Sequence, residues 1–206
     1  MKTLITIRNR DIKNSYAFKN KNIFLIFIIM MSAVFFVYLT YKSKLFEGIF
    51  SGNIELLNVY LNFIKNNSKP EVFTGLLLSA FVCYLSVALF STSIIGAPLI
   101  YITVFFKVTG LGTLLFSLYS EYGLSGIEYS VLVLLPGKYL MLLSLLLLSD
   151  SSSRLCTSIA GDIKGKSEEI KKYIIILVFT ALLMLISVII DYFAVTVFAG
   201  LFDLKN

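Results

Sequence analysis

Apolar residues in this chain form long runs that short polar stretches separate. The runs cover 23–41, 72–95, 98–119, 125–148 and 173–202. Each is close to or above the roughly 20 residues that a helix needs to cross about 30 Å of hydrocarbon. No series of short alternating strands, the pattern of an outer-membrane barrel, is present in the sequence. The pattern therefore predicts an all-α integral membrane helical bundle with about five transmembrane helices.

The longest polar connection, 42–71, has a helical pattern of its own. Its apolar residues recur at about helical spacing, and they are Phe46, Ile49, Phe50, Ile54, Leu57, Tyr60, Leu61 and Ile64. This spacing predicts an amphipathic helix, and the stretch from Lys65 to Pro70 then indicates a loop. Two placements fit: the helix lies on the membrane surface or under a partner, or it rests on helices of its own chain.

The distribution of lysine and arginine predicts how the bundle is oriented. We interpret 1–206 as one membrane domain, with a basic arm (1–22), the amphipathic segment (42–71) and a four-helix region (72–202). If the N-terminus lies inside, the inner segments carry eleven lysines and arginines and the outer segments carry five. Positive residues accumulate on the cytoplasmic side. We therefore predict a multi-pass protein of a bacterial cell membrane with its N-terminus inside and its C-terminus outside.

Composition argues against several other classes of protein. The chain is 58% hydrophobic, above the roughly 45–50% of soluble domains. The net charge is +6, and the basic residues flank the apolar runs. They do not form one solvated basic face, so no nucleic-acid partner is expected. The absence of histidine removes the usual nucleophile–base pairs and argues against a structural metal site. We expect no catalytic residue, no metal and no cofactor, and the lipid bilayer is the first partner.

Ionisable residues inside the apolar runs are the main candidates for a functional site. At about 1.5 Å per residue, Lys107 lies roughly 14 Å from the inner end of its helix, and Lys138 roughly 18–20 Å from the outer end of the next. Both therefore lie near the midplane, where a charge costs about 2.5–3.5 kcal/mol. Asp191 is the candidate counter-charge if its helix is tilted or begins late. The cluster either lines a polar cavity that binds an anion, or ties the bundle together by ion pairs and snorkelling lysines.

Proline and glycine predict two irregular places in the backbone. Gly96 and Pro98 predict a short turn, with Pro98 in the first turn of the next helix. Pro136 and Gly137 interrupt a helix in mid-span, because proline lacks the N–H that the helical hydrogen-bond pattern requires. In transporters such breaks expose helix ends to a ligand, whereas in many other membrane helices they are only kinks.

Small and polar residues predict one close helix contact and one loop. Gly110 and Gly112 let a neighbouring helix approach, with Thr109 and Thr113 able to bond across the contact. The stretch 149–172 follows an apolar run and is rich in serine, lysine and glycine. We expect it to be a flexible loop on the inner side of the membrane.

Several of these features occur together in a pattern that resembles the stage II sporulation protein M family. They are the turn at Gly96 and Pro98, the mid-helix Lys107 before Gly110 and Gly112, the loop with Tyr122, Gly123 and Gly126, the step Leu134, Leu135, Pro136, Gly137 and Lys138, and the late Asp191. The resemblance covers about 70–195. The chain differs where the family usually has histidine, asparagine or glutamine (Gly137 and Lys138), glutamate (Asp191) and glycine (Val108).

The resemblance implies a non-catalytic membrane scaffold in endospore engulfment. Family members in sporulation help to localise two peptidoglycan-remodelling hydrolases, stage II sporulation proteins D and P, at the septum. The segment 42–71 would then contact such extracytoplasmic partners. The residues themselves leave a second hypothesis open, a small transporter or permease subunit with a polar cavity around Lys107, Lys138 and Asp191. Either function is compatible with a homo-oligomer.

Overall fold

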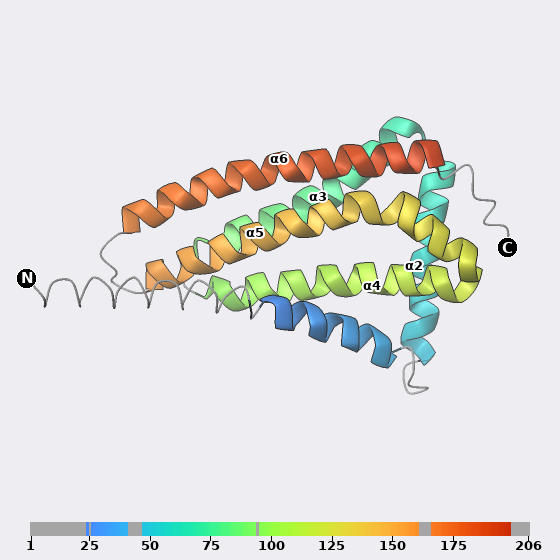
Figure 1. The fold of residues 1–206 in the computed structure, drawn as a ribbon, viewed down its shortest axis with the longest axis horizontal. Helices are drawn as coiled ribbons and strands as arrows, with labels where there is room; N and C mark the ends of the chain where they lie inside the picture. The colour runs from blue at the N-terminus through green and yellow to red at the C-terminus, as the bar shows by residue number, and fades with distance from the viewer. Residues whose placement is uncertain (1–23, 25, 41–46, 94, 161–165, 199–206) are drawn as a thin grey trace, which may run out of the picture.

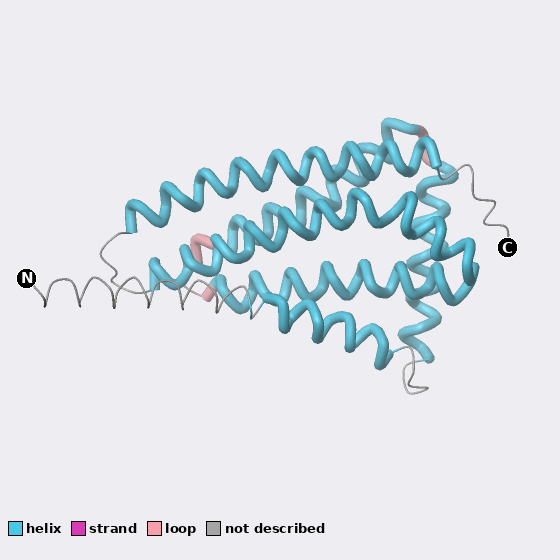
Figure 2. Tube along the Cα trace, viewed as in Figure 1, coloured by secondary structure: helices cyan, strands magenta, loops and turns pink. Residues whose placement is uncertain are grey.

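The structure, a computed structural model, describes residues 24, 26–40, 47–93, 95–160 and 166–198. The described helices are an N-terminal helix (Ile26–Thr40), α2 (Glu47–Asn66), α3 (Lys69–Phe90), α4 (Gly96–Tyr129), the π-helical turn η2 (Ser130–Leu134), α5 (Leu135–Ala160) and α6 (Lys166–Phe198). Figure 2 shows helix almost throughout these residues and no strand among them. The predicted all-α fold is confirmed, while the predicted basic arm (1–22) lies outside the described residues.

The helices α3, α4, α5 and α6 run side by side along the molecule, and α2 lies across one end of them (Figure 1). We call this the α2 end. There α4 folds back on itself at Gly123, which has φ 55° and ψ −124°, a backbone conformation that glycine adopts readily. A Cβ on Gly126 would lie 2.1 Å from the carbonyl oxygen of Leu118, so glycine also permits the close return of the chain.

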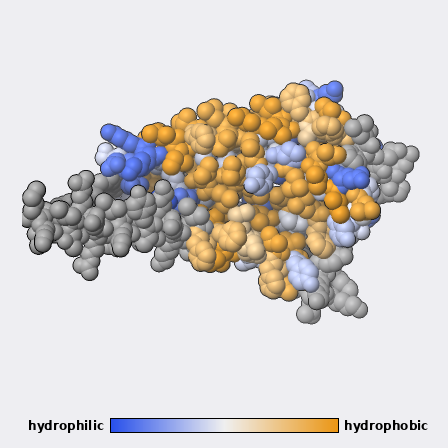
Figure 3. Space-filling model, viewed as in Figure 1, coloured by the Kyte–Doolittle hydropathy of each residue, from blue (hydrophilic) through white to orange (hydrophobic). Residues whose placement is uncertain are grey.

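Among the described residues, three helical stretches are long and apolar enough to cross a membrane. They are Lys69–Phe90, Gly96–Ile159 and Ser167–Phe198. The second has 64 residues and forms two antiparallel arms about Gly123, and the N-terminal helix is a shorter apolar helix beside α4. Figure 3 shows mostly apolar residues over the middle of the face in view, with the most hydrophilic residues towards its two ends. Side chains that face lipid have no reason to be polar, so this surface is that of an integral membrane protein.

The helix α2 covers the α2 end of the bundle with its apolar face. Leu57 is fully buried, and Tyr60, Leu61 and Ile64 pack against the same core at helical spacing. A Cβ on Gly75 of α3 would lie 2.4 Å from the ring of Phe63, so this glycine lets α2 approach closely. The predicted amphipathic helix is confirmed over Glu47–Asn66, and from Leu57 to Ile64 its apolar face rests on helices of its own chain, while the predicted position Phe46 lies outside the described residues.

A capping box begins α3 immediately after α2. The backbone N–H of Ser68 donates to Oε2 of Glu71 at 2.8 Å, and Pro70 occupies the first turn, where no N–H is needed. The loop that the sequence predicted from Lys65 to Pro70 is therefore only two residues long.

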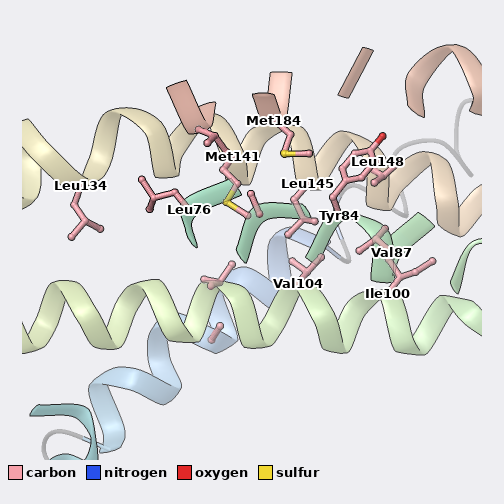
Figure 4. Close-up of a cluster of buried hydrophobic side chains, with 14 of the residues drawn as sticks. Leu76, Tyr84, Val87, Ile100, Val104, Leu134, Met141, Leu145, Leu148 and Met184 are labelled. Carbon is pink, nitrogen blue, oxygen red and sulfur yellow. The ribbon is translucent and has the colours of Figure 1, made fainter. Parts of the chain in front are cut away.

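The core lies between α3, α4, α5 and α6 (Figure 4). The labelled side chains in this cluster are Leu76, Tyr84, Val87, Ile100, Val104, Leu134, Met141, Leu145, Leu148 and Met184. Lipid is as apolar as these residues, so burial from water does not hold the helices together; dispersion contacts and interhelical hydrogen bonds do. One such bond is donated by the hydroxyl of Ser91 to that of Tyr173 at 2.7 Å.

The predicted flexible loop over 149–172 is wrong for most of its length. The helix α5 continues to Ala160, and α6 already begins at Lys166. Ser149 and Ser152 face the bundle and are 0% exposed. Serine is small enough to let helices approach closely, so tertiary packing overrides its preference for turns and caps.

Buried serines in this region offer a matched test of interhelical hydrogen bonding. Ser91→Ala removes the bond to Tyr173, so we expect the free energy of unfolding to fall by about 0.5–1.5 kcal/mol. Ser152→Ala removes a hydroxyl that has no hydrogen-bond partner among the described residues, so we expect no loss. Unfolding in detergent, followed by circular dichroism, measures both. Equal losses would contradict the assigned roles.

Candidate functional site

An ion pair joins α5 to α6 inside the membrane-spanning region. Nζ of Lys138 lies 2.7 Å from Oδ2 of Asp191, and these side chains are 18% and 6% exposed. The sequence identified Asp191 as a candidate partner for one of two lysines, and the structure pairs it with Lys138. Away from water, a hydrogen-bonded ion pair is the arrangement in which both charges can be tolerated.

Gly137 creates the space in which Asp191 lies. A Cβ on Gly137 would lie 1.9 Å from Oδ1 of Asp191 and 2.9 Å from its backbone nitrogen. One helical turn away from Asp191, the hydroxyl of Ser187 donates to the carbonyl oxygen of Gly137 at 2.9 Å. The missing side chain thus brings α6 close to α5, and the carboxylate lies directly against the neighbouring backbone.

The expected interruption at Pro136 is a wide turn and not a break. The π-helical turn η2 ends just before the proline, and the N–H of Leu135 donates to the carbonyl oxygen of Ser130. Such a wide turn accommodates the proline ring, which would clash with a carbonyl oxygen of the preceding turn in a regular helix. The helix then continues through Gly137, so no helix end faces a ligand here.

Lys107 lies near the ion pair but does not join it. Its partly buried side chain interacts electrostatically with Cys83, Lys138 and Asp191. Within the described parts of the chain it has no carboxylate within ion-pair distance. The group therefore contains two lysines and one aspartate, and an excess of positive charge remains inside the membrane-spanning region.

Tyr60 on α2 lies within electrostatic range of Asp191 and of a second tyrosine, Tyr129. Burial raises the pKa of Tyr60, and Tyr129 and the charge of Asp191 add to the effect. Tyr60 therefore remains a neutral phenol near the charged group. Sequence reasoning missed Tyr60 and Tyr129 as site residues, because aromatic residues are common in apolar segments. A tyrosine at the buried position of an amphipathic helix was the available signal.

The two glycines after Lys107 have different surroundings. A Cβ on Gly112 would lie 3.2 Å from Cγ2 of Val37, so the N-terminal helix makes the expected close approach there. Gly110 has nothing within 4 Å of its Cβ position. Thr113 donates to the carbonyl oxygen of Gly110 within α4, not across a helix contact. The hydroxyl of Thr109 is buried and has no partner among the described residues.

The turn at Gly96 lies at the opposite end of the bundle. A Cβ on Gly96 would lie 1.7 Å from the carbonyl oxygen of Phe90, so only glycine fits this turn, and Pro98 lies in the first turn of α4 as predicted. The thiol of Cys156 on α5 donates to the carbonyl oxygens of Phe90 and Ser91. No pattern in the sequence indicated this contact.

Fold and site together define an all-α multi-pass membrane protein whose helices are joined by an intramembrane ion pair. The chain belongs to the family described as "Stage II sporulation protein M", whose family model matches residues 22–195. The match includes the N-terminal helix and α2 and extends beyond the 70–195 of the resemblance. It makes the chain a sporulation-related membrane protein. No curated protein and no solved structure matched the chain.

A double-mutant cycle tests the ion pair. Asp191→Asn leaves Lys138 without its counter-charge in a buried place, so we expect a loss of about 3–5 kcal/mol in unfolding free energy. Adding Lys138→Met should restore part of that loss, because no unpaired charge then remains. Unfolding of the purified protein in mixed micelles gives the energies. Strictly additive losses would mean that the two side chains do not interact.

The control for this cycle is Glu168→Gln, which removes an exposed ion pair with Lys172 and should change the unfolding free energy little.

Two glycine substitutions of equal size test the role of Gly137. Gly137→Ala places a methyl group against Asp191 and should destabilise the bundle by about 1–3 kcal/mol. Gly110→Ala meets open space and should be neutral or stabilising by up to about 1 kcal/mol, because alanine favours the helix. Thermal unfolding in detergent compares the two variants. A Gly137→Ala protein as stable as Gly110→Ala would show that α5 and α6 do not need this contact.

Proposed function

We propose that this chain is a non-catalytic membrane scaffold that localises peptidoglycan-remodelling hydrolases during endospore engulfment. The observation that carries the proposal is the family match, which covers residues 22–195 of the 206-residue chain. The partners implied by the family resemblance are stage II sporulation proteins D and P. The proposed location is the sporulation septum of the bacterial cell membrane.

The use of polar groups in the bundle supports a static role. Asp191 neutralises Lys138, and Ser187 occupies the carbonyl oxygen of Gly137. At the opposite end, Ser91 donates to Tyr173. Each of these contacts joins two different helices, so the polar side chains fix helix positions. A fixed frame suits a protein whose task is to hold other proteins in place.

In the proposed orientation the N-terminus lies inside, the C-terminus lies outside and the α2 end faces the outside. The face of α2 that points away from the bundle exposes Asn58, Val59, Asn62 and Lys65. Its apolar face is already occupied by the core. Between Leu57 and Asn66, where side-chain exposure is described, a hydrolase outside the membrane would therefore meet a polar helical surface with one exposed valine, which is suited to a reversible interface.

The excess charge at Lys107 is the observation that favours the alternative, a small transporter or permease subunit. In that case water reaches Lys107 and Lys138. Single cysteines at these positions, in a chain whose Cys83 and Cys156 are replaced by serine, would then react with a membrane-impermeant thiol reagent. Lack of labelling from both sides of the membrane would argue against transport.

Crosslinking in sporulating cells tests the scaffold. Deletion of the gene should arrest engulfment, and the N-terminally tagged chain should capture wall hydrolases. Val59→Glu combined with Asn62→Arg changes the exposed face of α2 and should abolish capture at normal protein abundance. The matched control is Lys171→Glu, an exposed change at the opposite end, which should capture normally.

Two results would count against this proposal. Failure of the unaltered chain to capture any hydrolase would contradict the scaffold function. Normal capture by the α2 variant would leave the scaffold in place but remove the exposed face of α2 as its contact surface.

A further inference from the structure

Lys107 is a cation that the described bundle does not neutralise. It comes eleven residues after Gly96 and sixteen before Gly123, which places it about 16 Å and about 24 Å along α4 from those turns. Lys138 uses the one carboxylate nearby, that of Asp191. A charge at this depth normally faces a protein partner or water.

The position of Lys107 on α4 places it beside an open surface. Val104 and Val108 are buried against the bundle, whereas Phe106 is 68% exposed towards lipid. Lys107 is partly buried between these two faces. Gly110, one helical turn further on, is exposed and has no atom within 4 Å of its Cβ position. Residues three apart are neighbours on a helix, so another helix that packs on Gly110 comes within reach of Lys107.

We propose that Lys107 and Gly110 form a docking site for the transmembrane helix of a partner protein that carries an aspartate or glutamate at mid-membrane depth. Charge complementarity selects this occupant, because its carboxylate would pair with the remaining lysine. A lipid phosphate is not the occupant, because it stays in the headgroup region, whereas Lys107 lies near the middle of its helix. The inference rests on the proposed scaffold function and names the membrane-embedded part of that contact.

A second copy of the chain does not supply the carboxylate. Asp191 pairs with Lys138, and Asp150 pairs with Arg154. The other carboxylates of the membrane-spanning helices, within the residues described, lie near a helix end or near the turn at Gly123. They are Glu71, Glu121, Glu128, Glu168 and Glu169. Because the described residues of a second copy offer no unpaired carboxylate at this depth, we assign the site to a different protein.

A synthetic probe tests the site without the natural partner. The full-length chain is reconstituted in phosphatidylcholine vesicles with a fluorescent leucine–alanine transmembrane peptide that has one central aspartate, and energy transfer reports binding. We expect binding about tenfold tighter than for a peptide with central leucine. A peptide with its aspartate at the membrane surface should bind like the leucine peptide.

Variants of the chain assign the effect to these residues. Lys107→Met should remove the preference for aspartate, and Lys107→Arg should keep it. Gly110→Leu should weaken binding of the aspartate peptide by closing the contact surface, and it changes a position with free space around it. Lys171→Met, an exposed change outside the site, is the control. Circular dichroism of each variant verifies folding, and Gly110→Leu carries the test if Lys107→Met does not fold.

The outcomes separate this inference from the proposed function. Equal binding of the aspartate and leucine peptides, or a preference that survives Lys107→Met, would overturn the docking site. Energy transfer between two labelled copies of the chain that depends on Lys107 would also overturn it, in favour of self-association. If the chain binds the aspartate peptide selectively but captures no hydrolase in cells, the docking site is supported and the scaffold function is contradicted.

Discussion

A charged side chain inside a membrane is stable only where another protein group neutralises it, and in this chain that constraint acts between α5 and α6. Lys138 and Asp191 form their ion pair across these two helices. The contact requires the helices to lie unusually close, which Gly137 allows because it has no side chain. The register of α6 against α5 is therefore fixed at one point by charge and by the absence of a single methyl group.

Other features of the fold fit around this contact. The wide turn η2 lets the backbone pass Pro136 without ending the helix, so Gly137 and Lys138 follow in regular α-helix. Ser187 adds a hydrogen bond to Gly137 one turn earlier on α6. Tyr60 on α2 lies within electrostatic range of the charged group. Lys107 has no carboxylate within ion-pair distance among the described residues, which separates the packing role of Lys138 from the binding role proposed for Lys107.

Sequence reasoning succeeded where one physical signal dominated. The length of the apolar runs indicated membrane helices, and helical spacing in 42–71 predicted α2 and its buried face. It failed at 149–172, where serine composition suggested a loop and the structure has α5 up to Ala160. Local preference for a turn is small compared with the gain from packing small side chains between helices, and the sequence does not reveal which neighbours are present.

The sequence by itself determined the all-α membrane class, through the length of its apolar runs, and the family, through the match over residues 22–195. Only the tertiary structure showed which lysine pairs with Asp191 and that Gly137 allows α5 and α6 to approach closely. It also showed that α2 rests on its own bundle. Those outcomes depend on distances between residues far apart in the chain. Depth along one helix can be counted from the sequence, but rotation and approach between helices cannot.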